Sequence, residues 1–390
     1  MLLDGYRVLD FTNEQGYLCG KILGDLGADV IKIEPPGGDP ARRRGPFYHD
    51  EPDPEKSLSW WAYNINKRGI TLNIECPEGQ EIVRKLVPTA HCLVESFSPG
   101  YLEKLGLGYQ LLSNINPGLV FVAITPFGSD GPWRDLQAPD LVGAALGGMM
   151  LWTGEPDRYP LRISVEQSYL NAGSEGSVAA IIGLYHAEAT GEGQFIDVSM
   201  LESWLPAIAH PIIHWDFNKN ILRREGKYRS GEGGAGIRLR NIWECRDGYV
   251  FTRIYGGKFG VKTNNGFARW MQEEGVSTML WDKTDWDNFD IASVSQPKID
   301  ALEETLEKFL KTKSKEELYH RAVATGIQVA PIWGPRELVN NQQLQARHFW
   351  QEVESPHTAE KTLYPGYFTQ VDGSPAAIRR RAPLPGEHNQ

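Results

Sequence analysis

The chain has 390 residues, more than a single hydrophobic core usually organises, so we expect two domains. Hydrophobic residues make up 41% of the sequence and charged residues 23%, which is typical of a globular protein. The net charge of −10 argues against a nucleic-acid or anionic-membrane partner, because both attract basic surfaces.

The cysteines and the first residues bear on the compartment. Cys19, Cys76, Cys92 and Cys245 form no CxxC pair and no metal-ligand pattern, which favours reduced thiols. The start of the chain has no basic n-region, and no stretch reaches the ~18 apolar residues of a transmembrane helix. We therefore expect a cytoplasmic protein. Its 12 tryptophans favour an oligomer, because large aromatic side chains are enriched in interfaces as well as cores.

The first ~130 residues alternate strand and helix patterns. Short apolar runs predict strands, and apolar residues at helical spacing predict helices. The alternation indicates an open α/β sheet with parallel strands. The expected strands are 6–11, 29–34, 70–74, 91–97 and 119–128, and the expected helices are 18–26 and 77–87.

The later part of the chain changes character. Small-residue patterns predict helices over 141–153 and 172–189, the second of them preceded by a loop. A polar, basic, Gly-rich stretch from about 218 to 240 indicates a linker and a mobile loop. Further predictions are a strand at 194–200, a helical start after 201, a hairpin at 241–256, charged helices over 284–325 and a strand and turn at 327–335.

No generic catalytic motif stands out. GEGGAG at 231–236 is neither a GxGxxG after a strand nor a Walker A motif, and no HExxH or GxSxG occurs. The residues by themselves therefore predict a two-domain α/β protein without indicating its chemistry.

The order of several phrases is more informative than any single motif. The chain resembles the class III CoA-transferases, the family of formyl-CoA transferase, from residue 2 to 389. Among the phrases that carry the resemblance are RVLDFT (7–12), LGDLGADVIKIEPPGGDPAR (23–42), VESFSPGYLEKLGLGY (94–109), TGEGQFIDVSMLES (190–203), VAPIW (329–333) and APLPGEHN (382–389).

The resemblance implies a fold. A large Rossmann-like domain would comprise residues 1–218 and 331–390, and a smaller α+β domain would comprise 219–330. The small domain would carry an active-site loop with Gly231, Gly233 and Gly234. Two such chains would interlock as a dimer, each threading the other.

The resemblance also implies a mechanism in which an aspartate attacks an acyl-CoA thioester and forms a mixed anhydride. In the family this aspartate begins a DxxxG pattern, 22 residues before the first glycine of a TGxGQ turn. That glycine is Gly191 here, and counting back 22 residues gives 169. The pattern's glycine falls on Gly173, so no gap is needed. The residue at the nucleophile's position is Tyr169.

A tyrosine does not substitute for this carboxylate, because its ordinary pKa of about 10 keeps it neutral at pH 7. Tyr169 either fills space, uses its hydroxyl in binding or in an interface, or acts as a new nucleophile. Glu166, three residues earlier, is the nearest carboxylate and an alternative nucleophile, or else a solvated loop residue. In an extended loop its side chain would point away from that of Tyr169.

Other positions concern CoA. Leu72 and Phe97 match apolar positions near the adenine, and Lys104 stands where an arginine is expected. Three further positions depart from the family's pattern, and we expect weak or absent CoA binding in this chain's own cleft. They are Pro35 in place of a basic residue, Ser96 in place of an asparagine, and Glu14, which would repel phosphates.

We therefore expect a subunit of a heteromeric class III CoA-transferase that lacks its own nucleophile. Its partner would be a homologous catalytic subunit that binds the CoA thioester substrate, and no cofactor or metal is expected. The arrangement resembles that of succinyl-CoA:(R)-benzylsuccinate CoA-transferase. Two alternatives to this function are an active transferase or acyl-CoA isomerase that uses Glu166, and a CoA-binding or scaffolding protein. A third is a racemase of the same family, which uses a histidine and an aspartate as paired acid and base. The histidine is expected near Pro139-Asp140, and neither partner is present.

Overall fold

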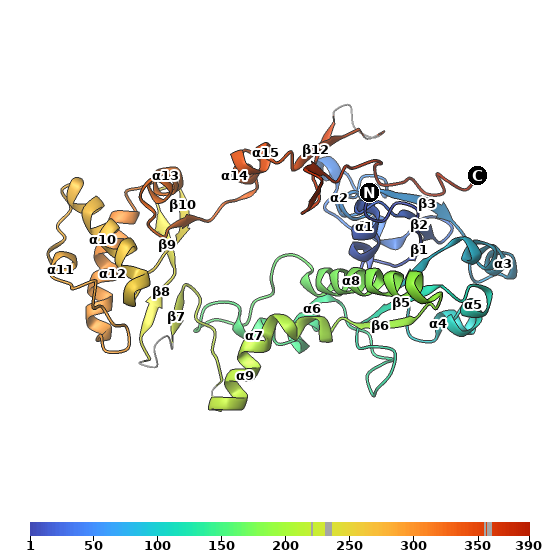
Figure 1. Ribbon diagram of the computed structural model, residues 1–390, viewed down its shortest axis with the longest axis horizontal. Helices are drawn as coiled ribbons and strands as arrows, with labels where there is room; N and C mark the ends of the chain where they lie inside the picture. Colours follow the sequence, from blue (N-terminus) through green and yellow to red (C-terminus); the bar gives the residue numbers. More distant parts are fainter. Residues whose placement is uncertain (220, 231–235, 355, 357–360) are drawn as a thin grey trace. The chain divides into compact units, whose positions relative to one another are not determined.

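The computed structural model describes residues 1–219, 221–230, 236–354, 356 and 361–390 (Figure 1). The chain forms two compact units. The expected small domain, 219–330, overlaps the second unit, which also includes 151–161 and continues to residue 338. Gly231, Gly233 and Gly234 lie outside the described residues. The first unit comprises Met1–Met150, Arg162–Ile221 and Val339–Gln390, and the second comprises Leu151–Leu161 and Leu222–Leu338.

The first unit contains a six-stranded sheet in which all neighbouring strands are parallel, so the expected α/β class is confirmed. The strand order is β3-β2-β1-β4-β5-β6. This order reverses direction between β1 and β4, and ligands of open α/β sheets bind beyond the carboxyl ends of such a strand pair. The strands are β1 (Arg7–Phe11), β2 (Asp29–Glu34), β3 (Lys67–Thr71), β4 (Cys92–Glu95), β5 (Val120–Thr125) and β6 (Phe195–Ser199).

The third strand corrects a prediction. It lies at Lys67–Thr71 and not at 70–74, and its residues pair with β2 from Val30↔Lys67 to Glu34↔Thr71. The polar start of this segment hid the strand, because Lys67 is fully buried and satisfied by an ion pair that the sequence pattern does not reveal.

Helices cover both faces of the sheet. The face of Val8 and Val94 packs against α1 and α8, and the face of Leu9 and Leu93 packs against a cluster that includes Val83. The helices of this unit are α1 (Tyr17–Asp25), α2 (Leu58–Asn64), α3 (Pro77–Leu86), α4 (Tyr101–Lys104), α5 (Tyr109–Ile115), α6 (Asp140–Leu146), α7 (Met149–Trp152, which continues into the second unit), α8 (Gln167–Thr190) and α9 (Ala209–Asn218). Short 3-10 helices are η1 (Pro40–Arg43), η2 (Tyr48–Asp50), η3 (Val87–Thr89), η4 (Glu202–Trp204) and η5 (Pro206–Ile208).

Small residues let α8 approach its neighbours closely. A Cβ atom at Gly173 would lie 2.9 Å from the Cβ of Leu18 on α1, and one at Gly176 would lie 2.8 Å from the Cδ1 of Ile124 on β5. The expected start of this helix at residue 172 is wrong, since α8 begins at Gln167. Position 169 therefore lies in the first turn of a helix and not in a loop.

The second unit has its own antiparallel sheet and core. The expected hairpin is present, with Arg246 and Asp247 joining β9 and β10. The expected helical stretch from 284 begins only at residue 296. The core includes the buried Trp243, Trp281 and Trp286. The elements are β7 (Tyr228–Ser230), β8 (Arg238–Arg240), β9 (Ile242–Cys245), β10 (Gly248–Phe251), α10 (Gly257–Glu273), α11 (Met279–Asp282), α12 (Gln296–Leu310), α13 (Lys315–Thr325), β11 (Ala330–Pro331) and α14 (Pro335–Val339, whose last residue belongs to the first unit).

The last residues of the chain return to the first unit, where they run beside β3. The Asn66 N–H donates to the Arg380 carbonyl at 2.9 Å, and the His388 N–H donates to the Gly69 carbonyl at 2.9 Å. Within the described parts of the chain, no helix combines the length and apolarity needed to cross a membrane. The remaining elements are α15 (Gln342–Ala346), β12 (Trp350–Val353), β13 (Thr362–Pro365), β14 (Gln370–Val371) and β15 (Ser374–Pro375).

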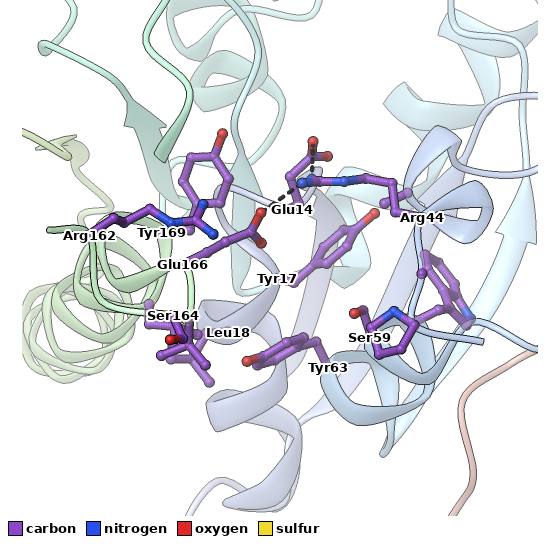
Figure 2. Close-up of a pocket in the computed structure, with 16 residues that line it drawn as sticks. Glu14, Tyr17, Leu18, Arg44, Ser59, Tyr63, Arg162, Ser164, Glu166 and Tyr169 are labelled. Carbon is purple, nitrogen blue, oxygen red and sulfur yellow. Dashed lines mark hydrogen bonds and ion pairs between the residues drawn. The ribbon is translucent and has the colours of Figure 1, made fainter. Parts of the chain in front are cut away.

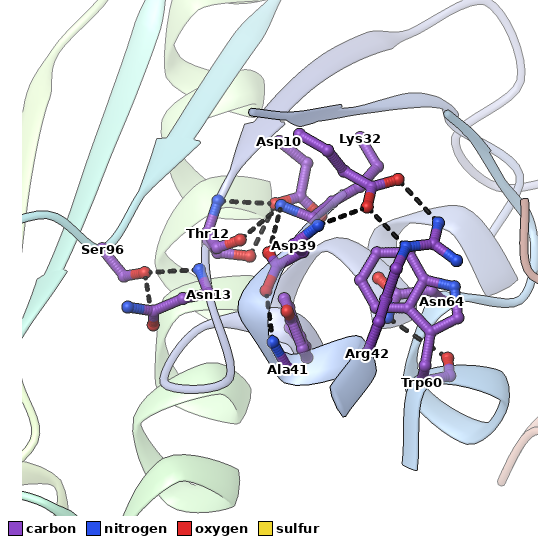
Figure 3. A network of polar contacts seen from close by, with 12 residues as sticks. Asp10, Thr12, Asn13, Lys32, Asp39, Ala41, Arg42, Trp60, Asn64 and Ser96 are labelled. Carbon is purple, nitrogen blue, oxygen red and sulfur yellow. Dashed lines mark hydrogen bonds and ion pairs between the residues drawn. The ribbon is translucent and has the colours of Figure 1, made fainter. Parts of the chain in front are cut away.

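A buried ion pair ties the centre of the sheet to its edge, and Figure 3 shows the polar contacts around its acidic member, Asp10. Lys67 Nζ on β3 lies 2.8 Å from Asp10 Oδ2 on β1, and both side chains are 0% exposed. Asp10 also accepts hydrogen bonds from the backbone N–H and hydroxyl of Thr12. Burial on its own would raise the pKa of Asp10, but the charges of Lys67 and Lys32 outweigh it and lower that pKa. Asp10 is therefore ionised inside the protein.

A second buried pair lies beside the first. Arg42 donates from Nε and Nη2 to the two carboxylate oxygens of Glu34, at 2.6 and 2.7 Å. Its guanidinium also lies over the ring of Trp60, 3.7 Å from the centroid. This pair fixes η1 against the end of β2, and so positions the segment that follows Arg42.

Replacing Lys67 by methionine should lower the free energy of unfolding by about 3–5 kcal/mol, because the carboxylate of Asp10 would remain buried without its counter-charge. Urea unfolding followed by circular dichroism measures the change. The control is Lys85→Met at an exposed lysine, which should change stability by less than about 0.5 kcal/mol. Equal, small effects of the two substitutions would contradict the account.

Candidate functional site

The site lies at the carboxyl ends of β1 and β4, where the strand order reverses. Residues 12–16 follow β1, and Ser96 follows β4. The Asn13 N–H donates to Ser96 Oγ at 2.8 Å, and Ser96 Oγ donates to Asn13 Oδ1 at 2.9 Å. Ser96 therefore joins the two loops at the edge of the sheet where open α/β sheets bind ligands.

A cavity of about 290 Å³ opens beside this point (Figure 2). Its walls come from the loop after β1, the start of α1, residues 41–46, helix α2, and the stretch from Arg162 to Leu170 that leads into α8. All of these segments belong to the first unit. The cavity is therefore contained within one folded body.

Tyr169 lies in the wall of this cavity and is 7% exposed. Asp140 fixes its helix, since Asp140 Oδ1 accepts the Ser168 N–H at 2.8 Å and the Asp140 carbonyl accepts the Ser168 hydroxyl at 2.9 Å. Burial raises the pKa of Tyr169, and a hydrogen bond with the backbone of Asp140 lowers it by a smaller amount. The side chain is consequently a neutral phenol at physiological pH.

Glu166 lines the same cavity, so the expectation that its side chain points away from that of Tyr169 is wrong. It directly precedes α8 and does not lie in an extended loop. Arg44 bridges it to Glu14, with Nη2 2.7 Å from Glu166 Oε1 and Nη1 2.8 Å from Glu14 Oε1 (Figure 2). Burial lowers the pKa of Arg44, but the two carboxylates outweigh it and raise that pKa. Both carboxylates thus share one permanent cation.

The residues predicted to contact CoA lie elsewhere. Leu72 and Phe97 pack against one apolar cluster on the other face of the sheet, where the Phe97 ring lies 4.8 Å from that of Tyr101. Lys104 is the exposed last residue of α4. None of these three side chains lines the cavity. Tyr169 and Glu166 thus line one cavity, and Leu72 and Phe97 pack against one apolar cluster. The second pair does not line the cavity of the first.

Sequence reasoning missed the two arginines of the cavity. Arg44 ends the ARRR run at 41–44, and this cluster of positive charge could have indicated a cation in the site. Arg162 lies in a segment without periodicity, where no pattern points to it. Arg162 Nη1 lies 3.9 Å from Asp140 Oδ2, and its side chain is 44% exposed. Among the described residues, no cluster of three or more His, Cys, Asp and Glu side chains is placed to hold a metal ion.

Glu95 at the end of β4 was also missed. It is 7% exposed, and its Oε2 accepts the Phe97 N–H at 2.6 Å. Burial raises the pKa of Glu95 to about 8, against the lowering effect of the Phe97 N–H. The side chain is therefore mostly protonated at neutral pH, directly beside the reversal of the strand order.

Comparisons with known proteins agree on one family. The sequence model of CoA-transferase family III matches residues 3–389. A curated relative from Thauera aromatica, succinyl-CoA:(R)-benzylsuccinate CoA-transferase subunit BbsE, is 35% identical over 99% of this chain and 92% of its own length. The beta subunit of succinyl-CoA–L-malate CoA-transferase from Chloroflexus aurantiacus is 28% identical over 100% of this chain and 92% of its own length.

Solved structures support the same assignment. The crystal structure of a CAIB/BAIF family protein from Brucella suis aligns with a TM-score of 0.83 at 27% sequence identity. The alignment covers 99% of this chain and 97% of that one. The match therefore extends over nearly the full length of both chains.

Glu95 should make stability depend on pH. The folded pKa of about 8 exceeds the unfolded value of about 4.5, so the folded state keeps a proton that the unfolded state releases. The stability that Glu95 contributes should therefore be fully present below about pH 4.5, fall between pH 4.5 and 8, and level off above. Because each pKa unit corresponds to about 1.4 kcal/mol, the loss from this group should reach several kcal/mol.

Glu95→Gln should remove the part of the slope that Glu95 contributes, because the amide does not titrate, and should leave the part from Glu303, whose pKa burial raises to about 7. Unfolding by urea at pH 5, 7 and 9 measures the slope for wild type and variant. The exposed Glu192→Gln serves as the matched control and should keep the wild-type slope. A Glu95→Gln protein with an unchanged slope between pH 5 and 9 would contradict the assignment.

Proposed function

Because the chain belongs to CoA-transferase family III, we propose that it is a subunit of a heteromeric CoA-transferase and forms no acyl intermediate of its own. The observation that carries the proposal is Tyr169. It stands at the position of the family's nucleophilic aspartate and lines a cavity beyond the ends of β1 and β4. A protonated phenol there does not form the mixed anhydride on which the transfer depends.

The carboxylates near Tyr169 do not readily replace it. Of the described residues that line the cavity, Glu14 and Glu166 carry carboxylates, and both are paired with Arg44. The carboxylate of Asp140 is buried, holds the start of α8 and does not line the cavity. A carboxylate that is already neutralised by a guanidinium is a weaker nucleophile than a free one.

An apolar surface supports a partner subunit. On α8, Val178, Ile182 and Tyr185 are exposed at the spacing of one helical face. On α9, Ile213 and Phe217 are exposed one turn apart. Exposed apolar side chains gathered on helix faces indicate an interaction surface, and we propose that a homologous chain covers them in an interlocked dimer.

The partner supplies the chemistry under this proposal. It carries the aspartate nucleophile and binds the CoA thioester, while this chain completes the assembly. The relatives named as subunits support a two-chain arrangement, and the benzylsuccinate enzyme supports succinyl-CoA as donor and an aryl-substituted succinate as acceptor.

The experiment that tests this function compares the chain alone with the chain co-purified with a family member that has aspartate in the DxxxG pattern. CoA transfer from succinyl-CoA, followed by chromatography of the acyl-CoA products, should occur only with the partner. Transfer by this chain alone would overturn the proposal. A stable complex without transfer in any pairing would favour the CoA-binding or scaffolding alternative.

A second candidate, transfer through Glu166, is favoured by one observation, namely that this carboxylate shares the cavity with Tyr169. Under the first proposal, Glu166→Gln in this chain should leave the turnover rate of the complex within about twofold of wild type. Steady-state rates of transfer measure this, with the partner's aspartate replaced by asparagine as the inactive control. If Glu166→Gln instead slows turnover by about 100-fold or more, the second candidate is established.

A further inference from the structure

We propose that His210 and His214 on α9 together bind one divalent transition-metal ion, such as Zn²⁺ or Cu²⁺, each through an imidazole nitrogen. The two side chains lie four residues apart on one helix. The site is separate from the cavity beside Tyr169, because neither histidine lines that cavity. The inference goes beyond the proposed function, since it assigns this chain a ligand that takes no part in acyl transfer.

The spacing of the two histidines is the first observation. Residues four apart on an α-helix project from the same side, with about 5–6 Å between their Cβ atoms. HPIIH at 210–214 therefore has the spacing of the two zinc-binding histidines of an HExxH motif, although it lacks the glutamate of that motif. Because that glutamate is the general base of such sites, the pair can bind a metal without being equipped to hydrolyse a substrate.

The distance between the two rings is the second observation. The ring centroids of His210 and His214 lie 4.5 Å apart, and the ring planes are inclined by 70°. A metal ~2.0–2.1 Å from one nitrogen of an imidazole lies about 3.2 Å from the ring centre, so two imidazoles bound side by side have centroids ~4.5–5 Å apart. The observed separation therefore matches that of a chelating pair.

The third observation is that both imidazoles are available. His210 is exposed and His214 is half-buried. Within the described part of the chain, neither ring makes a hydrogen bond or an ion pair. The Nδ1 of His214 is buried, which leaves Nε2 as the nitrogen that a metal can reach. A metal ion therefore gains two nitrogen ligands without displacing a polar contact of either side chain.

The donor set selects the kind of metal. Imidazole nitrogen suits zinc, copper and nickel, whereas Mg²⁺ and Ca²⁺ prefer oxygen ligands. Two imidazoles fill only part of the coordination sphere, and water would complete it. No described residue accepts a hydrogen bond from Nδ1 of His214, so the pair lacks the additional bond that strengthens many metal-binding histidines. We therefore expect reversible binding, with Cu²⁺ held more tightly than Zn²⁺.

Calorimetric titration of the full chain with ZnCl₂ tests the inference. The chain is used by itself because, under the proposed function, a partner covers Ile213 and Phe217 on the same helix. One Zn²⁺ should bind per chain, and MgCl₂ at the same concentrations should show no binding. Electron paramagnetic resonance with one equivalent of Cu²⁺ should show coupling to two imidazole nitrogens. Absence of zinc binding, or equal binding of Mg²⁺, would overturn the inference.

Substitutions assign the binding to this pair. His210→Gln and His214→Gln should each weaken zinc binding about tenfold or more, because a chelate needs both ligands. Two controls should leave the affinity unchanged: His320→Gln, at a histidine whose side chain is 68% exposed, and Cys76→Ser, at a partly exposed thiol. Unchanged affinity in either variant of α9, or a loss in either control, would indicate an adventitious ion only and would overturn the assignment.

A mere packing role for the ring pair would give a different result. His214→Phe keeps an aromatic ring beside His210 but removes its metal ligand. Zinc should raise the melting temperature of the wild-type chain, because it binds the folded state, and should not raise that of this variant. If zinc stabilises His214→Phe as much as wild type, the metal-binding role is wrong. His210→Gln, at an exposed position, gives the same comparison without altering the half-buried ring.

The outcome is separable from the proposed function. Zinc binding by this chain needs neither an acyl-CoA nor a partner subunit. Failure of zinc binding therefore overturns only the metal site, whereas CoA transfer by this chain alone overturns the proposed function and leaves the metal site standing.

Discussion

The buried ion pair between Asp10 and Lys67 is the constraint around which the first unit is built. It links the first and third strands across β2, and the helix that packs over it must come close. Gly20 on α1 provides that approach, since a Cβ atom there would lie 2.2 Å from Asp10 Oδ2. The loop that leaves β1 is held by Thr12, whose N–H and hydroxyl donate to the same carboxylate. The placement of Tyr17 at the start of α1 follows from this pair.

The same contacts explain why the cavity does not depend on an aspartate at position 169. Its walls depend on contacts outside position 169: Asp140 holds the start of α8, Arg44 joins the loop after β1 to the residue before α8, and Arg42 fixes η1 on β2. None of these contacts needs an aspartate at 169. A chain with tyrosine at this position can therefore keep the fold, the cavity and the surfaces that a partner would use under the proposed function.

Much of the fold was predictable because local sequence patterns indicate most of its strands and helices. Apolar runs such as 29–34 and 119–128 predict the parallel strands, and the sequence phrases shared with the family predict the architecture. The start of β3 was missed because buried Lys67 looks like a surface residue until its partner is known. The 22-residue spacing before Gly191 was enough to single out Tyr169. Arg44 and Arg162, which line the same cavity, come from segments far apart in the sequence, and no local pattern joins them. Glu166 was expected in an extended loop for a similar reason. The start of α8 directly after it is held by Asp140, which is distant in the sequence.

The central claim is that acyl transfer takes place on the partner and not on this chain. The most direct measurement is mass spectrometry of both chains after the complex has been mixed with an acyl-CoA and trapped with hydroxylamine. The account predicts a hydroxamate on the partner's aspartate and none on this chain. A hydroxamate on Glu166, or on any other carboxylate of this chain, would contradict it.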